Sequence, residues 1–130
     1  MRRTRSFSHS PHSVTDARRF AAEALPGASP ETRGVIALLV SELASNSIRH
    51  TASGFDLTIT SSAREIRVEA TDRDDGKPEM RSPAPTDPSG RGLQIVDMLS
   101  ADWGVEPLSK GKTVWFTLAV DAPVQARTAG

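Results

Sequence analysis

The sequence predicts one α+β domain, a two-layer sandwich in which helices cover one face of a mixed, mostly antiparallel sheet of about five strands. Apolar residues recur at helical spacing up to about residue 50 and alternate with polar residues from residue 57 onward. Clusters of glycine and proline separate these segments. A length of 130 residues is enough to bury one modest core. We expect a single domain over residues 1–130, with its core at about 7–120 and flexible tails at 1–5 and 121–130.

The first segment after the basic tail predicts a short edge strand, at about residues 5–10, followed by a helix. Ser13 fits an N-cap, and Asp16 three residues later completes a pair that resembles a capping box. Apolar residues then follow at helical spacing until Pro26 and Gly27 end the helix.

A second helix is predicted from Ser29 to about residues 51–54. Ser29 provides an N-cap, and Pro30 suits the first helical turn because its missing N–H is not needed there. The longest apolar run of the chain, residues 35–40, lies within this helix. We therefore expect the helix to pack against the core.

The remaining chain predicts strands and one more helix. Alternating apolar residues on both sides of residues 61–64 predict a β-hairpin with one buried face. The proline-rich segment 77–89 is expected to be a loop, and a short helix is expected to begin at Gly90-Arg91-Gly92. Further strands are predicted around Trp103 and Val105 and over residues 113–120, where Val114, Phe116, Leu118 and Val120 share one face.

The composition excludes several classes of protein. Lysine plus arginine and aspartate plus glutamate both number 16, so the formal net charge is zero, which argues against a general nucleic-acid-binding protein. No cysteine is present, so disulfides and thiolate metal sites are excluded. No segment approaches the length of a membrane span, and no apolar signal region follows the basic start. A cytoplasmic protein without membrane contact is the expectation.

The end of the second helix has side chains suited to chemistry. On a helix Glu42, Asn46 and His50 line one stripe, because they are four residues apart. An amide oxygen can bind a hard cation, and a carboxylate can accept a proton or orient water. The ordinary alternative is that Glu42 and Asn46 simply face solvent.

Three later segments also allow both a chemical role and an ordinary structural one: Asp72 to Gly76, Ser89 to Leu93, and Gly111 to Trp115. A carboxylate at a strand end, such as Asp72, accepts hydrogen bonds only, and glycines at a helix start let phosphates approach the backbone amides. The alternatives are a turn aspartate, a plain helix cap and, for Thr113, an ordinary strand residue.

In this order and spacing the four segments resemble the N, G1, G2 and final threonine boxes of the GHKL ATPases, over about Phe7 to Val120. Among these ATPases the chain looks like the small bacterial anti-sigma-factor serine kinases and their actinobacterial relatives. The resemblance implies the Bergerat-like fold, ATP and Mg²⁺ as cofactors, Glu42 as general base and Asn46 as the Mg²⁺ ligand. It implies that Asp72 binds the adenine amine, with Thr113 touching adenine through water. It places the remaining nucleotide contacts at Gly76, Gly90, Arg91, Gly92 and Leu93.

The chain departs from the family pattern in two places. Asp74 stands where the G1 box usually has its first glycine, although Gly76 is retained. Pro88 stands where many of these kinases have an arginine that assists the γ-phosphate, and Arg91 within the box is a candidate substitute. Nucleotide binding is therefore better supported by the sequence than catalysis.

The resemblance implies a serine/threonine protein kinase that phosphorylates a STAS-type anti-sigma antagonist and sequesters a sigma factor, which would make it a regulator of transcription. The alternative is a non-catalytic nucleotide-binding module that acts only by sequestering its partner. A sensor histidine kinase is disfavoured because there is no room for a dimerisation helix with a phospho-accepting histidine. A gyrase-type ATPase would need a transducer domain. Whether the chain forms a homodimer stays open.

Overall fold

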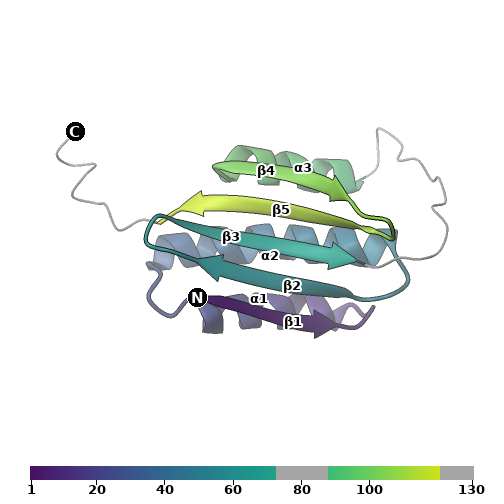
Figure 1. Ribbon diagram of the computed structural model, residues 1–130, viewed down its shortest axis with the longest axis horizontal. Helices are drawn as coiled ribbons and strands as arrows, with labels where there is room; N and C mark the ends of the chain where they lie inside the picture. The colour runs from purple at the N-terminus through teal and green to yellow at the C-terminus, as the bar shows by residue number, and fades with distance from the viewer. Residues whose placement is uncertain (73–87, 121–130) are drawn as a thin grey trace.

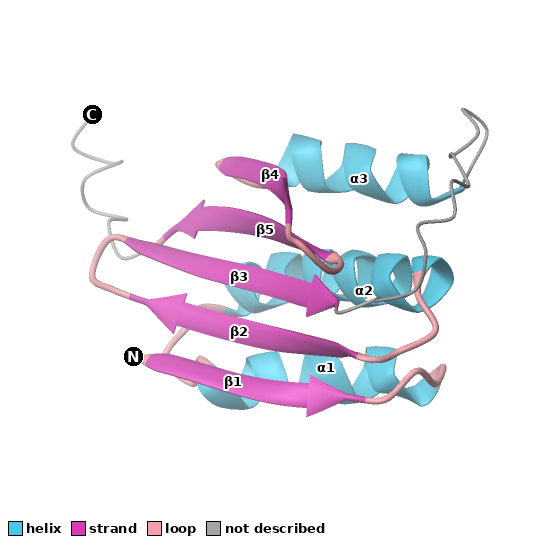
Figure 2. Cartoon of the chain, turned by 45° about the vertical axis from the view of Figure 1, so that its right-hand side comes forward, coloured by secondary structure: helices cyan, strands magenta, loops and turns pink. Residues whose placement is uncertain are grey.

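The computed structural model describes residues 1–72 and 88–120, and for residues 88–93 it describes the backbone alone. The elements follow in the order β1 (Arg2–Phe7), α1 (His12–Ala24), α2 (Pro30–His50), β2 (Phe55–Ser61), β3 (Glu65–Asp72), α3 (Pro88–Leu99), β4 (Asp102–Pro107) and β5 (Lys112–Ala119). The helices form one layer and the strands the other, as Figure 1 and Figure 2 show. The predicted two-layer α+β fold is confirmed.

The five strands form one open sheet in the order β1-β2-β3-β5-β4. Every pairing between these described strands is antiparallel. The sheet is therefore antiparallel throughout, whereas the sequence predicted a mixed, mostly antiparallel one. Strand β5 lies between β3 and β4 because the chain passes through α3 and β4 before it returns to the middle of the sheet (Figure 1). This return places the start of β5 beside the end of β3, where Lys112 pairs with Asp72.

The core lies between the sheet and the helices. In β3 burial alternates strictly, and Ile66, Val68, Ala70 and Asp72 occupy the buried face. Their register partners in β5 include Phe116 opposite Val68 and Val114 opposite Ala70. Three inward residues of α2, namely Leu39, Val40 and Leu43, are fully buried against this layer. Burial of each such side chain contributes about 1.5–3 kcal/mol to folding.

Strand β1 corrects the expectation of a flexible tail at residues 1–5. The strand pairs with β2 over its whole length, from Arg2 to Phe7, and begins three residues before the predicted strand. Its anchor is Phe7, which stacks on Phe55 at 5.3 Å between ring centroids and meets the edge of Phe20 at 6.0 Å. The strand tolerates its arginines because it is an edge strand on which charged side chains reach solvent. The other predicted tail, 121–130, lies outside the described residues.

The start of α1 also differs from the prediction. The helix begins at His12, with Pro11 in the N-cap position and no side-chain cap. The Ser13 hydroxyl instead donates to the Ser8 carbonyl at 2.7 Å, so it ties the helix to the end of β1. Serine side chains often form hydrogen bonds of this kind to nearby backbone groups, so a serine near a helix start is not always its cap.

Helix α2 starts and ends as predicted. The Ser29 hydroxyl oxygen accepts a hydrogen bond from the Thr32 amide at 3.1 Å, and Pro30 occupies the first turn. The helix continues to His50, and Thr51 follows as the C-cap. It lies between α1 and α3 and packs against both (Figure 1). Among the described residues, no helix is both long and apolar enough to span a membrane.

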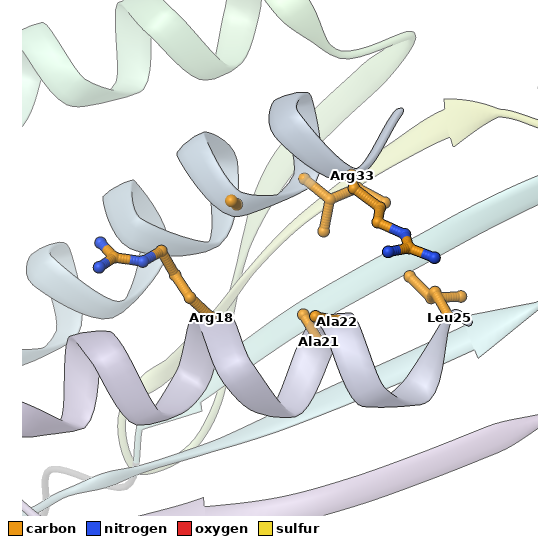
Figure 3. A pocket seen from close by; sticks show the side chains of 7 residues that line it. Arg18, Ala21, Ala22, Leu25 and Arg33 are labelled. Atoms are coloured by element: carbon orange, nitrogen blue, oxygen red, sulfur yellow. The ribbon is translucent and has the colours of Figure 1, made fainter. Parts of the chain in front are cut away.

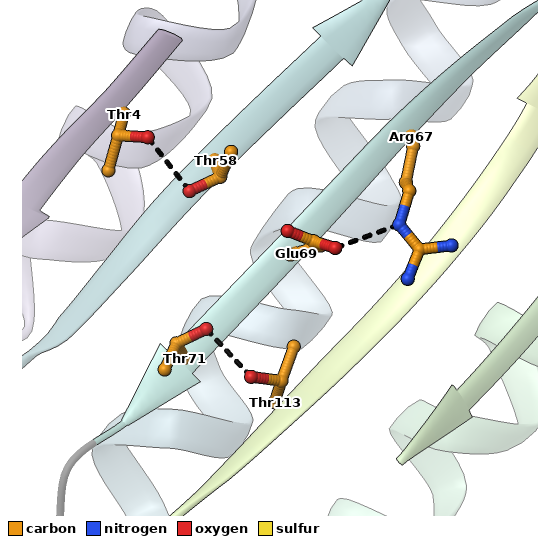
Figure 4. Close-up of polar contacts among 6 residues, drawn as sticks. All are labelled: Thr4, Thr58, Arg67, Glu69, Thr71 and Thr113. Atoms are coloured by element: carbon orange, nitrogen blue, oxygen red, sulfur yellow. Dashed lines mark hydrogen bonds and ion pairs between the residues drawn. The ribbon is translucent and has the colours of Figure 1, made fainter. Parts of the chain in front are cut away.

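The sheet's other face has no helix over it in the described part of the chain, and polar side chains cross from strand to strand on this face (Figure 4). Thr4 and Thr58 join β1 to β2 through their hydroxyls at 2.9 Å. Arg67 of β3 donates to Glu69 at 2.8 Å, and its guanidinium lies 4.3 Å from the ring centroid of Trp115 in β5. The threonine pair and the Arg67–Trp115 contact join neighbouring strands on this face, whereas the Arg67–Glu69 pair lies within β3.

Candidate functional site

Segments that are far apart in the sequence meet at one end of the sandwich. The four residues after His50 connect α2 to Phe55 at the start of β2, and Phe55 pairs with Asp72 at the end of β3. Lys112, at the start of β5, pairs with Asp72 from the other side. The backbone of α3 begins at the same end, at Pro88 (Figure 2). Most of the residues that the sequence singled out therefore gather at this end of the fold.

Asp72 is the most deeply buried charged residue among those described. Its side chain is 2% exposed and continues the inward face of β3, so the carboxylate points to the helix layer. Lys112 is 28% exposed, and its Nζ donates to Asp72 Oδ2 at 3.0 Å. A buried carboxylate needs such a partner, because leaving the charge unpaired in a low dielectric is strongly unfavourable.

Gly111 allows the chain before β5 to approach Asp72 closely enough for this pair to form. Its φ is +87°, in the left-handed region, and a Cβ at this position would overlap the backbone oxygen of Asp72 and lie 2.8 Å from its Oδ1. Only glycine combines this backbone conformation with so close an approach. The turn is closed by a hydrogen bond from the Leu108 amide to the Gly111 carbonyl at 3.0 Å. Gly111 thus sets the position from which Lys112 reaches Asp72.

Helix α2 brings a buried amide to the same end. Asn46 is 7% exposed and continues the inward stripe of Leu39 and Leu43. Glu42, one turn earlier, is partly exposed, whereas His50 is exposed at the helix end and has a contact of its own. The stripe predicted from spacing alone therefore has a buried amide in its middle and a partly accessible carboxylate before it. The alternative that Asn46 simply faces solvent is therefore wrong.

The second glycine segment lies inside α3, which corrects the expectation that it precedes a helix. The helix begins at Pro88, so the predicted loop ends before Ser89, and Gly90 and Gly92 belong to the first helical turns. Proline at the first position fits this earlier start. The amides of an N-terminal helical turn still lack partners within the helix, so this backbone remains suited to an anion. The side chains of Arg91 and Leu93, like Asp74, Gly76 and most of the predicted loop, lie outside the described residues.

Thr113 does not lie beside Asp72. In β5 it occupies the face opposite to Lys112 and Val114, and its hydroxyl bonds to that of Thr71 at 2.8 Å (Figure 4). The structure therefore places Thr113 and Asp72 on opposite faces of the sheet, whereas the resemblance implies that both contact adenine. Within the segment from Gly111 to Trp115, sequence reasoning assigned a role to Thr113 alone and missed those of Gly111 and Lys112. The sequence pattern that could have identified Lys112 is the alternation of Val114 and Phe116 toward the core, because the same alternation places residue 112 on the inward face.

The side chains at this end have the chemistry to hold a purine nucleotide with its Mg²⁺. Asp72 offers an acceptor for an amine, and the Asn46 amide offers an oxygen for a hard cation. The described residues contain no group of three or more histidine or acidic side chains placed to hold a metal ion. A nucleotide-borne Mg²⁺ needs few protein ligands, because phosphates and waters complete its coordination.

Two hollows elsewhere in the described chain have different characters. The cleft between α1 and α2 in Figure 3 holds about 30 Å³ and is lined by residues that include Arg18, Ala21 and Arg33. That volume is about the share of one water molecule in the liquid, so the cleft is too small for a nucleotide. A wider groove of about 660 Å³ includes Ile66 and Ser61, at the opposite end of the sheet from Asp72.

Comparisons with known proteins agree with this fold. A histidine kinase domain from the Erythrobacter litoralis EL346 blue-light activated histidine kinase matches with 32% identity and a TM-score of 0.53, over 69% of this chain and 45% of that one. The Acinetobacter baumannii histidine kinase AdeS matches with 14% identity and a TM-score of 0.55, over 92% of this chain and 68% of that one, which shows the fold alone. The chain thus spans less than half of the first of these structures. No curated protein sequence matches.

The sequence profile of the histidine kinase-like ATPase domain matches residues 7–118, nearly the whole described core. This range includes the buried Asp72, the buried Asn46 and the Gly111–Lys112 turn. The matched range agrees with the interval over which the four boxes were identified. The chain therefore belongs to the histidine kinase-like ATPase domain family, within the GHKL superfamily.

Proposed function

We propose that the chain binds ATP with Mg²⁺ at the end of the sandwich where Asp72, Asn46 and the first turns of α3 meet. The observation that carries this proposal is the burial of Asp72 at a strand end with its carboxylate on the helix side. A strand-end carboxylate of this kind has a clear use as the acceptor for the adenine amine. Membership of the ATPase domain family supports the same assignment.

Each residue has a separate task in this proposal. Asp72 accepts from the adenine amine, and Asn46 supplies an oxygen to Mg²⁺. The backbone of Gly90 and Gly92, in the first turns of α3, faces the phosphates. Bound Mg²⁺ neutralises phosphate charge during transfer. No role is assigned to Thr113, because its hydroxyl bonds to Thr71 on the open face of the sheet.

We further propose that the activity is that of an anti-sigma-type serine/threonine protein kinase in the cytoplasm. Glu42, partly exposed one turn before Asn46, would accept the proton of a serine or threonine hydroxyl on the substrate protein. The substrate would be a STAS-type antagonist, and a sigma factor would be the sequestered partner. This finer assignment rests on the resemblance of the four boxes to those kinases.

A second function is favoured by one specific observation. The carboxylate proposed to recognise adenine already has a charged partner in the absence of any ligand, because Lys112 Nζ donates to its Oδ2 at 3.0 Å. A module that sequesters its partner without transferring phosphate, with or without nucleotide, would also conserve this pair. Phosphate transfer separates the two functions, because only the kinase modifies the partner.

The test begins with calorimetric titration of the whole chain with ATP in the presence of Mg²⁺. We expect saturable binding, and we expect Asp72→Asn to weaken it by about 1–3 kcal/mol, the effect of losing a buried polar pairing. Asp16→Asn is the matched control, since Asp16 is an exposed carboxylate on α1. Failure of the wild-type chain to bind ATP would overturn the nucleotide site itself.

Transfer is tested separately with labelled ATP and a STAS-domain antagonist protein. Label on a serine or threonine of that protein supports the kinase. ATP binding without transfer, together with stable capture of a sigma factor, supports the sequestering module instead. Capture that is unchanged by ATP would further indicate that the nucleotide does not control the partner.

A further inference from the structure

Lys112 has hydrogen-bonding capacity beyond its pairing with Asp72. It lies on the inward face of β5, directly opposite Asp72, although the residues after it on this face, Val114 and Phe116, are apolar and buried. Its ammonium group donates to one oxygen of the carboxylate, Oδ2. An ammonium group has three donors, so this contact leaves capacity for more hydrogen bonds.

The pair presents two complementary chemical groups next to each other. Asp72 Oδ1 is not the oxygen that Lys112 engages, and it can accept a hydrogen bond. Lys112 Nζ, 3.0 Å from the other carboxylate oxygen, can donate one. An acceptor beside a donor matches a ligand edge on which a donor lies beside an acceptor. Adenine has such an edge, because ring nitrogens N1 and N7, both acceptors, flank its exocyclic amine.

The backbone keeps this arrangement in place. Gly111 has φ +87° and packs so closely on Asp72 that an added Cβ would overlap the Asp72 backbone oxygen. The Leu108–Gly111 hydrogen bond closes the turn from which Lys112 begins. A side chain that starts from a fixed backbone loses less freedom when it binds a ligand.

We propose that Lys112 is a specificity-determining residue of the nucleotide site, which donates a hydrogen bond to a ring nitrogen next to the adenine amine while Asp72 accepts from that amine. The proposal rests on the proposed function, since it needs a bound adenine. It adds a donor to a site that otherwise recognises the base with an acceptor alone. Lys112 then has two tasks: it neutralises the buried carboxylate and it recognises the base.

The test measures the affinity of the whole chain for Mg·ATP, 1-deaza-ATP and 7-deaza-ATP, in which one ring acceptor at a time becomes a C–H group. We expect the wild-type chain to bind one of these analogues roughly tenfold more weakly than ATP, the effect of losing one hydrogen bond from a charged group. Lys112→Met should bind ATP and that analogue equally. Lys112→Arg, which keeps a donor, should retain the discrimination.

The comparison within each variant removes any general effect of the substitution on the fold. Should Lys112→Met be too unstable because Asp72 loses its partner, the double variant Asp72→Asn with Lys112→Met removes both charges, and it should also show no discrimination. Equal affinity of the wild-type chain for ATP and both analogues overturns the proposal while the nucleotide site stands. Equal discrimination by wild type and Lys112→Met overturns it as well. Absence of ATP binding by the wild type overturns both proposals.

Discussion

Replacing Gly111 by alanine is expected to remove a large part of the stability of this domain. The left-handed conformation is unfavourable for an L-residue with a side chain by about 1–2 kcal/mol. The new Cβ would also overlap the Asp72 backbone oxygen, so the start of β5 must move away from β3. That movement weakens the Asp72–Lys112 pair, and complete loss of a partner for a buried charge amounts to about 3–5 kcal/mol. Partial loss added to the backbone term gives about 3–5 kcal/mol in total.

Urea denaturation followed by circular dichroism measures this change. The change is large enough to detect, because the whole free energy of unfolding of such a domain is only about 5–15 kcal/mol. Gly34→Ala is the matched control: nothing lies within 4 Å of the added Cβ, and the residue is inside α2, so we expect a gain of about 0.5–1 kcal/mol. Gly111→Asn separates the two causes, since asparagine tolerates the left-handed region better but has the same Cβ. A destabilisation by Gly111→Ala below about 1 kcal/mol would show that the close approach to Asp72 does not constrain the turn.

Three further predictions concern single side chains. Thr113→Val should lower the free energy of unfolding by about 0.5–1.5 kcal/mol through loss of the Thr71 hydrogen bond and leave ATP affinity unchanged in calorimetry, whereas a tenfold loss of affinity would restore the contact with adenine expected from the sequence. Glu42→Gln should abolish phosphate transfer in the labelling assay with little effect on ATP affinity, because a general base acts in the transition state, and transfer at the wild-type rate would make Glu42 structural. Ser29→Ala should destabilise the domain by about 1 kcal/mol in denaturant titration through loss of the cap on the Thr32 amide, and an unchanged midpoint would show that water replaces the cap.

The sequence by itself determined the elements whose signals are local. The change of apolar spacing from about four to two distinguished α2 from the β2–β3 hairpin, because the side-chain period of each backbone conformation is fixed by its geometry. The Ser29-Pro30 start of α2 was equally readable, since a cap and a proline act within one turn. Asp72 at a strand end also followed from alternation. These features depend on neighbouring residues alone.

Several features depended on contacts that local patterns do not contain. Residues 2–5 read as a charged tail, yet they form an edge strand because β2 offers a partner and Phe7 packs against Phe55 and Phe20. Ser13 had the chemistry of a cap but bonds to the Ser8 carbonyl across the turn. In both cases a partner brought near by the fold outweighed the local preference.

The composition of the candidate site was decided by tertiary structure. Family resemblance pointed to Thr113, but the register of β3 with β5 places Lys112 opposite Asp72 and turns Thr113 to the other face. A shift of one residue changes which face a side chain occupies, because the side-chain period of a strand is two. The close contact of Gly111 with Asp72 accompanies that register, and it joins residues about forty positions apart in the sequence that meet only when the sheet forms.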